Sequence, residues 1–257
     1  MSNFAHWRQI LADHNWEEGK VITVMDASYR TRVVVTCYKQ GRQTAEFANG
    51  GGNYGAYVEL TRPDGTWISQ GMGIVPVLPD GRLLMVVEQR PPQWRLPNQP
   101  TSIIVGGEKL DLQQFGPYSS LEFPGGAVDP GGSKLKAGFL KELREETAAP
   151  EQWVEVYLRK PPFFAEGADL ALEAQVCVVY LTNHGFQPHV KNDGGLDVMA
   201  LSVADVQQNI WAGNIRSAQA ALMQWAFYQE AQLARVSYGE RGSMIEAGYL
   251  EVLNLKI

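Results

Sequence analysis

The sequence has few cysteines, a deficit of basic residues and no long hydrophobic run. Only two cysteines, Cys37 and Cys177, occur in 257 residues, and both lie in apolar strings, VVVTCY and AQVCVVYL. Thiols in such surroundings are typical of buried, reduced side chains, which excludes a disulfide framework. The N-terminal region carries acidic residues and only short apolar runs, so we expect neither a secretion signal nor a membrane span there. The sequence therefore favours a cytoplasmic protein.

The charge balance limits the kinds of partner. Lysine and arginine together number 22 against 28 acidic residues, which gives a formal net charge of -6. Without a basic face the chain cannot release counterions from a phosphate backbone, so we expect neither nucleic acid nor an anionic membrane as partner. A hydrophobic fraction of 45% is typical of a folded protein, with one large domain or two small ones. A small molecule is the expected partner.

The first third of the sequence has the composition of β-strands. Lys20 to Lys39 is rich in β-branched residues, and Tyr57 to Gln70 has a Pro-Asp-Gly turn between two apolar runs. Gly73 to Glu88 repeats this arrangement with Asp80-Gly81 at the turn. These patterns predict antiparallel strands and two hairpins.

The rest of the chain alternates between loop, strand and helix patterns. Gln89 to Ser120 is rich in proline, glycine and polar residues, which predicts a long loop serving either as a binding lid or as a surface insertion. Trp153 to Arg159 and Ala171 to Leu181 have strand character. Ala204 to Val236 has apolar residues at helical spacing and predicts one or two helices, with Gly213 as the break.

Three closely spaced glutamates end a predicted helix over Lys134 to Thr147. Glu142, Glu145 and Glu146 are three and four residues apart, so their carboxylates lie on a common helical face. Like charges so placed cost about 0.2 to 0.5 kcal/mol per pair. A divalent cation with oxygen ligands, most commonly magnesium, would remove this repulsion. The alternative is a charged helix face in solvent.

A glycine-rich turn precedes this helix. Pro124-Gly125-Gly126 lets the backbone approach a ligand closely and offers carbonyl and amide groups to a metal or a phosphate. Turn and acidic helix together resemble the Nudix box, in which a glycine turn precedes the pattern Arg-Glu-apolar-any-Glu-Glu-any-Gly. Gly126 and the run from Lys141 to Ala149, KELREETAA, stand at the matching places.

The resemblance is partial, and the differences concern the supports of the metal-binding helix. Gly132 stands where the pattern has its first glutamate, with one extra residue before the helix. Lys141 replaces the arginine and Ala148 the late glycine, while the three metal-type glutamates remain. Two interpretations follow: an active hydrolase with an altered box, or a weakened relative that binds or senses a nucleotide-sugar without turnover.

Further motifs are similar to those of the ADP-ribose pyrophosphatase branch of the Nudix hydrolases. Gln89-Arg90, the run Leu121 to Gly126 (LEFPGG), and Gly213 to Ala218 (GNIRSA) occur in the order of that branch. The resemblance implies an α/β (α+β) fold, a Nudix-type α/β/α sandwich with a mixed sheet, over residues 71–235. It also implies that the β-rich residues 1–70 build a homodimer, and it leaves the tail, residues 236–257, without a role.

The activity implied by the resemblance is hydrolysis of the pyrophosphate bond in a nucleoside diphosphate linked to another moiety, such as ADP-ribose or a related nucleotide-sugar. The cofactor would be Mg²⁺, with Mn²⁺ as the alternative. Glu142, Glu146 and the Gly125 carbonyl would be direct ligands, and Glu145 would bind a second ion or its water. All three glutamates are thus catalytic candidates.

Substrate contacts are expected at the ends of the predicted strands. Arg90 is the candidate for a diphosphate contact because guanidinium matches phosphate geometry, although a strand-end arginine in solvent is the alternative. Glu122 and Gly126 are further candidates for contact with substrate.

The general base and the residue that stacks on the nucleotide base are left open by the sequence. Asp193, Asp197 and Glu166 are the candidates for the base. The aromatic candidates for stacking are Trp94, Tyr118, Phe163 and Phe164.

Overall fold

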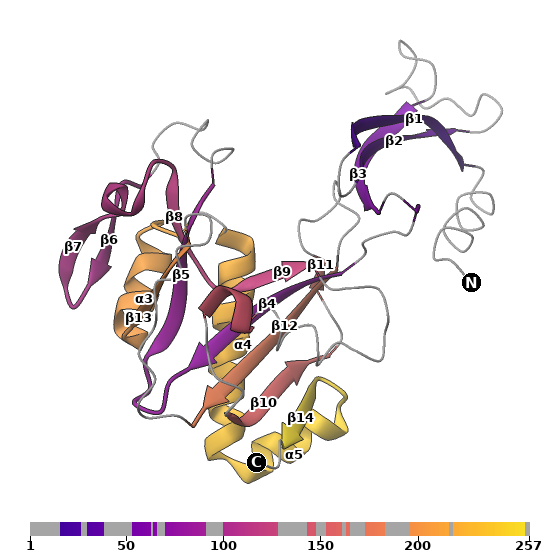
Figure 1. Cartoon of the computed structure of the whole chain (residues 1–257). Coiled ribbons are helices and arrows are strands. Elements are labelled where there is room, and N and C mark those ends of the chain that lie inside the picture. Colours follow the sequence, from indigo (N-terminus) through magenta and orange to yellow (C-terminus); the bar gives the residue numbers. More distant parts are fainter. Residues whose placement is uncertain are drawn as a thin grey trace. The chain divides into compact units, whose positions relative to one another are not determined.

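The chain folds into two compact units, formed by residues 1–69 with 166–172 and by residues 70–165 with 173–257 (Figure 1). The computed structural model describes residues 16–26, 30–38, 53–62, 64–65, 70–90, 100–127, 143–147, 153–160, 163–164, 173–182, 196–215 and 218–254. Each unit has its own sheet.

The first unit contains a three-stranded antiparallel sheet in the order β1-β2-β3. Its strands are β1 (Trp16–Asp26), β2 (Arg30–Tyr38) and β3 (Asn53–Thr61). The predicted strand region of Lys20 to Lys39 is confirmed, since β1 and β2 pair from Trp16 opposite Tyr38 to Asp26 opposite Arg30. Its β-branched residues suit a pleated surface.

Of the predicted hairpin over Tyr57 to Gln70, the turn is confirmed, and most of its second run, residues 66–69, lies outside the described residues. Gly65 has φ +85°, and its N–H donates to the Arg62 carbonyl at 2.9 Å. The strands on either side of this turn, β3 and β4 (Gln70–Val77), belong to different sheets.

The second unit contains a nine-stranded mixed sheet, and its main path runs β13-β5-β4-β12-β10-β14. The predicted hairpin over Gly73 to Glu88 is confirmed, because β4 and β5 pair antiparallel with Val77 opposite Leu83. In contrast, β4 and β12 run parallel. The remaining strands are β5 (Leu83–Gln89), β8 (Ser119–Glu122), β9 (Gly125–Ala127), β10 (Trp153–Arg159), β11 (Phe163–Phe164), β12 (Glu173–Leu181), β13 (Leu196–Leu201) and β14 (Leu250–Asn254).

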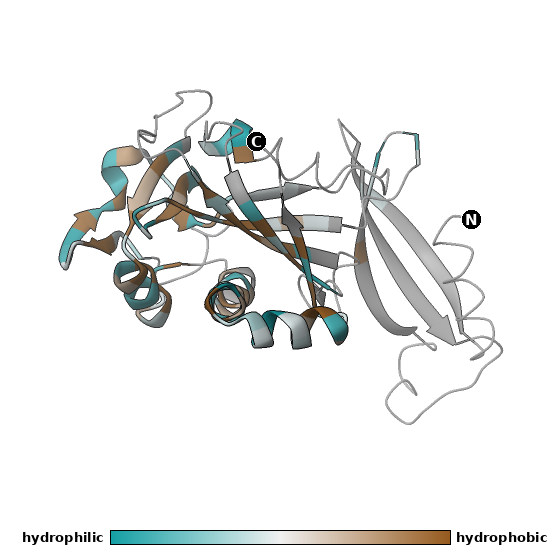
Figure 2. Ribbon diagram, turned by 90° about the horizontal axis from the view of Figure 1, so that it is seen from below, coloured by the Kyte–Doolittle hydropathy of each residue, from teal (hydrophilic) through white to brown (hydrophobic). Residues whose placement is uncertain are grey.

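Successive strand residues point to opposite sides of this sheet, so each face carries its own set of buried side chains. Helical residues cover both faces. One buried set packs with α3 (Val203–Trp211) and α4 (Ala218–Val236), which lie together on one face in Figure 2. The other set packs with Leu143, from the helical residues 143–147. The predicted α/β fold with a mixed sheet is confirmed.

The helices α3 and α4 are separated by a sharp turn. Gly213 has φ +72°, which confirms the predicted break. The side chain of Ser202 caps α3 by accepting a hydrogen bond from the Asp205 amide at 3.0 Å. Of the helices in the described parts of the chain, none is both long and apolar enough to cross a bilayer.

The segment predicted as a loop between Gln89 and Ser120 contains regular structure over its second part. Residues 102–111 form a hairpin of β6 (Ser102–Val105) and β7 (Glu108–Asp111), followed by the 3-10 helix η4 (Leu112–Phe115). Its turn is Gly106-Gly107, with φ +60° and +82°. Ile103 and Leu112 are fully buried in the core that includes α3 and α4. This part is therefore a packed element of the domain, which corrects the loop prediction.

The C-terminal tail also joins the second unit. After α5 (Tyr238–Glu246), strand β14 pairs with β10 at the edge of the sheet. The carboxylate of Glu155 in β10 accepts a hydrogen bond from the Tyr157 hydroxyl at 3.0 Å. It also pairs with Arg235 at 3.5 Å and Arg241 at 3.3 Å. These contacts tie α4 and α5 to the sheet.

Candidate active site

Strand alternation places two acidic side chains and an arginine on one face of β5 and β8. The strands are antiparallel, with Val86 directly opposite Glu122. Glu88 and Arg90 follow Val86 at intervals of two, so they share its face with Glu122. This face also carries the core cluster that contains Leu143. The predicted substrate residues Arg90 and Glu122 are thus neighbours.

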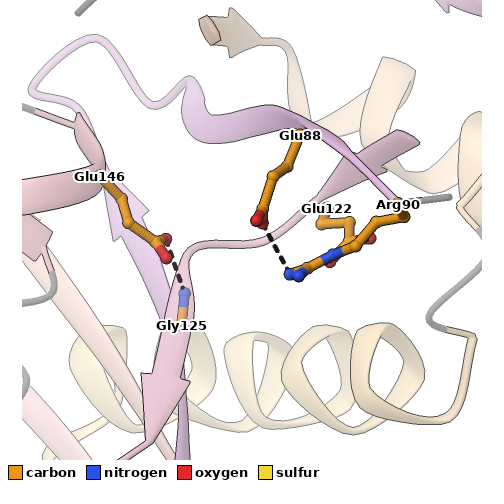
Figure 3. A network of polar contacts seen from close by, with 5 residues as sticks. All are labelled: Glu88, Arg90, Glu122, Gly125 and Glu146. Carbon is orange, nitrogen blue, oxygen red and sulfur yellow. Dashed lines mark hydrogen bonds and ion pairs between the residues drawn. The ribbon is translucent and has the colours of Figure 1, made fainter. Parts of the chain in front are cut away.

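The guanidinium of Arg90 is held between two carboxylates (Figure 3). Its Nε lies 3.2 Å from Oε1 and 3.3 Å from Oε2 of Glu122, and its Nη2 lies 3.1 Å from Oε2. The same Nη2 is 2.6 Å from Glu88. Burial lowers the pKa of Arg90, but its hydrogen bond to Glu122 and the charges of Glu122, Glu88 and Glu146 outweigh this effect, so the pKa is raised. Arg90 remains cationic.

Glu88 is the partner of Arg90 that sequence reasoning missed. Burial is the main cause that raises the pKa of Glu88, the Glu122 charge adds to it, and Arg90 opposes it. The side chain of Glu88 is 29% exposed and that of Glu122 only 9%. The signal was present in the sequence, because residues 88 and 90 of a strand lie on the same face.

Gly125 lies against the backbone of β4 at a distance that only glycine permits. Residues 125–127 pair with β4, with Gly125 opposite Gly73. A Cβ atom on Gly125 would collide with the Met72 carbonyl oxygen, which is backbone and cannot move aside. The close approach expected of the Pro124-Gly125-Gly126 turn is therefore made to the sheet itself.

Glu146 reaches this turn from the helix. Its Oε2 accepts a hydrogen bond from the Gly125 N–H at 2.9 Å (Figure 3). Leu143 and Thr147, both fully buried, anchor the helical residues, and the Thr147 hydroxyl donates to the Leu143 carbonyl. Glu145 is exposed, whereas Glu146 is half-buried. The structure thus brings together Gly125 and Glu146, two of the predicted metal ligands.

The hydrogen-bond pattern of β9 sets the direction of the Gly125 carbonyl. The Ile74 N–H donates to the Pro124 carbonyl at 2.8 Å, so Gly125 and Gly73 form a pair without mutual hydrogen bonds. The N–H and C=O of such a residue both point away from the partner strand. The Gly125 carbonyl therefore points to the side from which Glu146 approaches.

These donors suit a hard cation, since a carboxylate and a backbone carbonyl are the oxygen ligands that Mg²⁺ takes. Among the residues that the structure describes, no group of three or more His, Cys, Asp or Glu side chains is placed to hold a metal ion. The third predicted direct ligand, Glu142, lies outside the described residues. The metal site therefore stays a prediction, supported by the position of Glu146 and Gly125.

Several other predicted site residues lie outside the described part of the chain: Asp193, Glu166 and Trp94. Phe163 and Phe164 are placed as strand residues only. Asp197 lies on β13 opposite Val87, on the face covered by α3 and α4, and so the sheet separates it from Glu146. Gly126 follows Gly125 in β9, opposite Met72.

Neither a family model nor a curated protein sequence matches the chain. Among solved structures, one described as the crystal structure of an ADP compounds hydrolase is similar to it, with a TM-score of 0.42 and 14% sequence identity. The similarity covers 84% of this chain and 96% of the other.

Proposed function

We propose that the protein hydrolyses the pyrophosphate bond of a nucleoside diphosphate linked to another moiety, ADP-ribose or a related nucleotide-sugar, in the manner of the Nudix enzymes that its sequence resembles. The observation that carries the proposal is the contact between Glu146 and the Gly125 amide. It joins the two halves of the predicted box, glycine turn and acidic helix, at one point in space.

The cation of the proposal is Mg²⁺, with Mn²⁺ as the alternative. Glu146 and the Gly125 carbonyl would hold it together with Glu142, and Glu145 would hold a second ion or its water. Bound there, the cation would neutralise phosphoryl charge and lower the pKa of a bound water. Asp193 and Glu166 stay candidates for the general base.

Arg90 is the proposed diphosphate contact, and its surroundings explain how it could serve. Glu122 and Glu88 engage its Nε and Nη2, while Nη1 takes no part in these bonds. The side chain is 40% exposed. The two carboxylates thus hold Nε and Nη2 of the guanidinium, and Nη1 can donate hydrogen bonds to phosphate oxygens.

A hydrolysis screen tests the proposal. The full chain would be assayed with Mg²⁺ against ADP-ribose, other nucleotide-sugars, NADH, diadenosine polyphosphates and nucleoside triphosphates. The variant Glu146→Gln would be compared with Glu246→Gln, which alters an exposed helical glutamate of α5. We expect turnover of at least one linked nucleoside diphosphate, lost in Glu146→Gln and kept in Glu246→Gln.

Two results would count against this function. Turnover unaffected by Glu146→Gln would show that the reaction does not use this site. Binding of nucleotide-sugars without turnover of any compound would favour the alternative, a protein that senses such a ligand. Thermal unfolding of both variants controls for loss of the fold, because the Gly125 hydrogen bond also has a structural role.

A further inference from the structure

Tyr118 has a backbone conformation that large side chains rarely adopt. Its φ is +68°, and no other non-glycine residue in the described part of the chain has a positive φ. A Cβ-bearing aromatic residue is strained in this left-handed region, where glycine or asparagine is the usual choice. Such strain persists where the surroundings fix it, and it gathers at functional sites.

The surroundings of Tyr118 fix its backbone from both sides. Before it, Gly116 closes η4 through a hydrogen bond from its N–H to the Gln113 carbonyl at 3.1 Å. After it, the Ser119 hydroxyl donates to the Gly116 carbonyl at 2.9 Å, and Ser119 pairs with Gln89. The turn that holds Tyr118 is therefore attached to both η4 and β5.

This turn lies directly against the proposed diphosphate residue. The Arg90 N–H donates to the Tyr118 carbonyl at 2.8 Å, which continues the pairing of β5 with β8 by one residue. Despite these backbone bonds, Tyr118 is 47% exposed. A large aromatic side chain thus starts from the backbone next to Arg90 and stays accessible to solvent.

We propose that Tyr118 is the residue on which the base of the substrate stacks, and that its strained backbone serves to present the ring beside Arg90. The inference rests on the proposed function, because it takes the ligand to be a nucleoside diphosphate whose phosphates contact Arg90. With the diphosphate at Arg90, the base, which is attached to it through a ribose, then reaches the side chain of Tyr118. The ligand class is a nucleoside diphosphate with any base, since each base offers a π face to an aromatic ring.

The experiment compares a probe with a base and a probe without one. Isothermal titration in the presence of Mg²⁺ would measure the affinity of the full chain for ADP and for inorganic pyrophosphate. The variants are Tyr118→Asn, which removes the ring and suits the left-handed backbone, and Tyr118→Phe, which restores an aromatic ring. Tyr238→Asn, at an exposed tyrosine of α5, is the matched control.

We expect Tyr118→Asn to weaken ADP binding by about tenfold or more, because the base loses its stacking partner. The affinity for pyrophosphate stays at the wild-type value, and Tyr118→Phe restores the affinity for ADP. The Tm of Tyr118→Asn does not fall, because asparagine relieves the backbone strain. This combination of an unchanged Tm with a loss restricted to ADP is not what a structural role gives.

Each other outcome overturns the inference for a recognisable reason. Undiminished ADP affinity in Tyr118→Asn means that the base stacks elsewhere. Equal losses for ADP and pyrophosphate mean that Tyr118 acts only through the position of Arg90. If the wild type binds neither probe, the proposed function fails first, and the role of Tyr118 fails with it.

Discussion

Asn209 is the residue whose removal most directly tests how the hairpin of β6 and β7 is held. It is fully buried on α3. Its side-chain amide forms hydrogen bonds with both the N–H and the carbonyl of Ile104, as the backbone of a paired strand does. The Ile104 N–H donates to Asn209 Oδ1 at 2.8 Å, and Asn209 Nδ2 donates to the Ile104 carbonyl at 2.7 Å. A third bond runs from Nδ2 to the Asp205 carbonyl at 2.9 Å.

The change Asn209→Ala removes all three of these bonds to backbone groups. A hydrogen bond contributes a net amount of about 1 kcal/mol, and a buried group left without a partner costs about 1 to 3 kcal/mol. We therefore expect the free energy of unfolding to fall by about 3 kcal/mol, and the Tm by about 6 to 12 °C for a domain of this size.

The assay is urea unfolding together with amide hydrogen exchange. In Asn209→Ala the Ile104 amide should exchange faster than in the wild type, since its acceptor is gone. The matched control is Asn214→Ala, which removes a single bond, from Asn214 Nδ2 to Asn209 Oδ1 at 2.9 Å. A stability loss in Asn209→Ala no greater than that in Asn214→Ala would refute the idea that Asn209 anchors the hairpin.

Three further predictions concern other parts of the fold. Gly125→Ala should destabilise the protein by about 2 kcal/mol or more, because its Cβ meets β4 backbone, whereas Gly73→Ala meets only the flexible end of an α4 side chain and should cost less in urea unfolding. Burial and the neighbouring carboxylate of β10 raise the pKa of Tyr157 to about 12 from 10.0, so the folded state keeps a proton that the unfolded state loses, and stability should fall between these pH values by about 2 kcal/mol. Tyr157→Phe should reduce this slope in unfolding measured across that pH range. The sheet of β1 to β3 is expected to build a homodimer, so sedimentation equilibrium should give twice the mass of one chain, and a monomer at all concentrations would contradict this.

Much of the fold could be predicted because its signals are local. The strand over Trp153 to Arg159 has the predicted bounds, and Gly213 ends α3 as a glycine at such a position should. The contact of Gly125 with Glu146 was also within reach of the sequence, since a known motif specifies both parts. In these cases the residue type and its immediate neighbours determine the structure.

The sequence predictions of strand structure fail where the partner of a strand lies far away in the sequence. The pattern of Gly73 to Glu88 predicts antiparallel strands, yet β4 also has a long parallel pairing with β12, about a hundred residues later. The hairpin at residues 102–111 was missed although Gly106-Gly107 is a typical two-residue turn. Its strands are four residues long, and they are fixed by Asn209 and Asp205 on α3, which no local pattern reveals.

The charges of the candidate site imply that cation and substrate depend on each other. Two carboxylates, Glu88 and Glu122, contact the guanidinium of Arg90, and the charge of a third, Glu146, also acts on it. A diphosphate would add further negative charge, so its binding needs a cation to offset the repulsion. Because coupling is reciprocal, ADP should bind more tightly as Mg²⁺ rises, and Mg²⁺ more tightly as ADP rises. Titrations of ADP at several Mg²⁺ concentrations test this, and Glu146→Gln should weaken the coupling. An ADP affinity that does not depend on Mg²⁺ would show that Arg90 alone suffices, with Glu88 and Glu122 serving only to orient it.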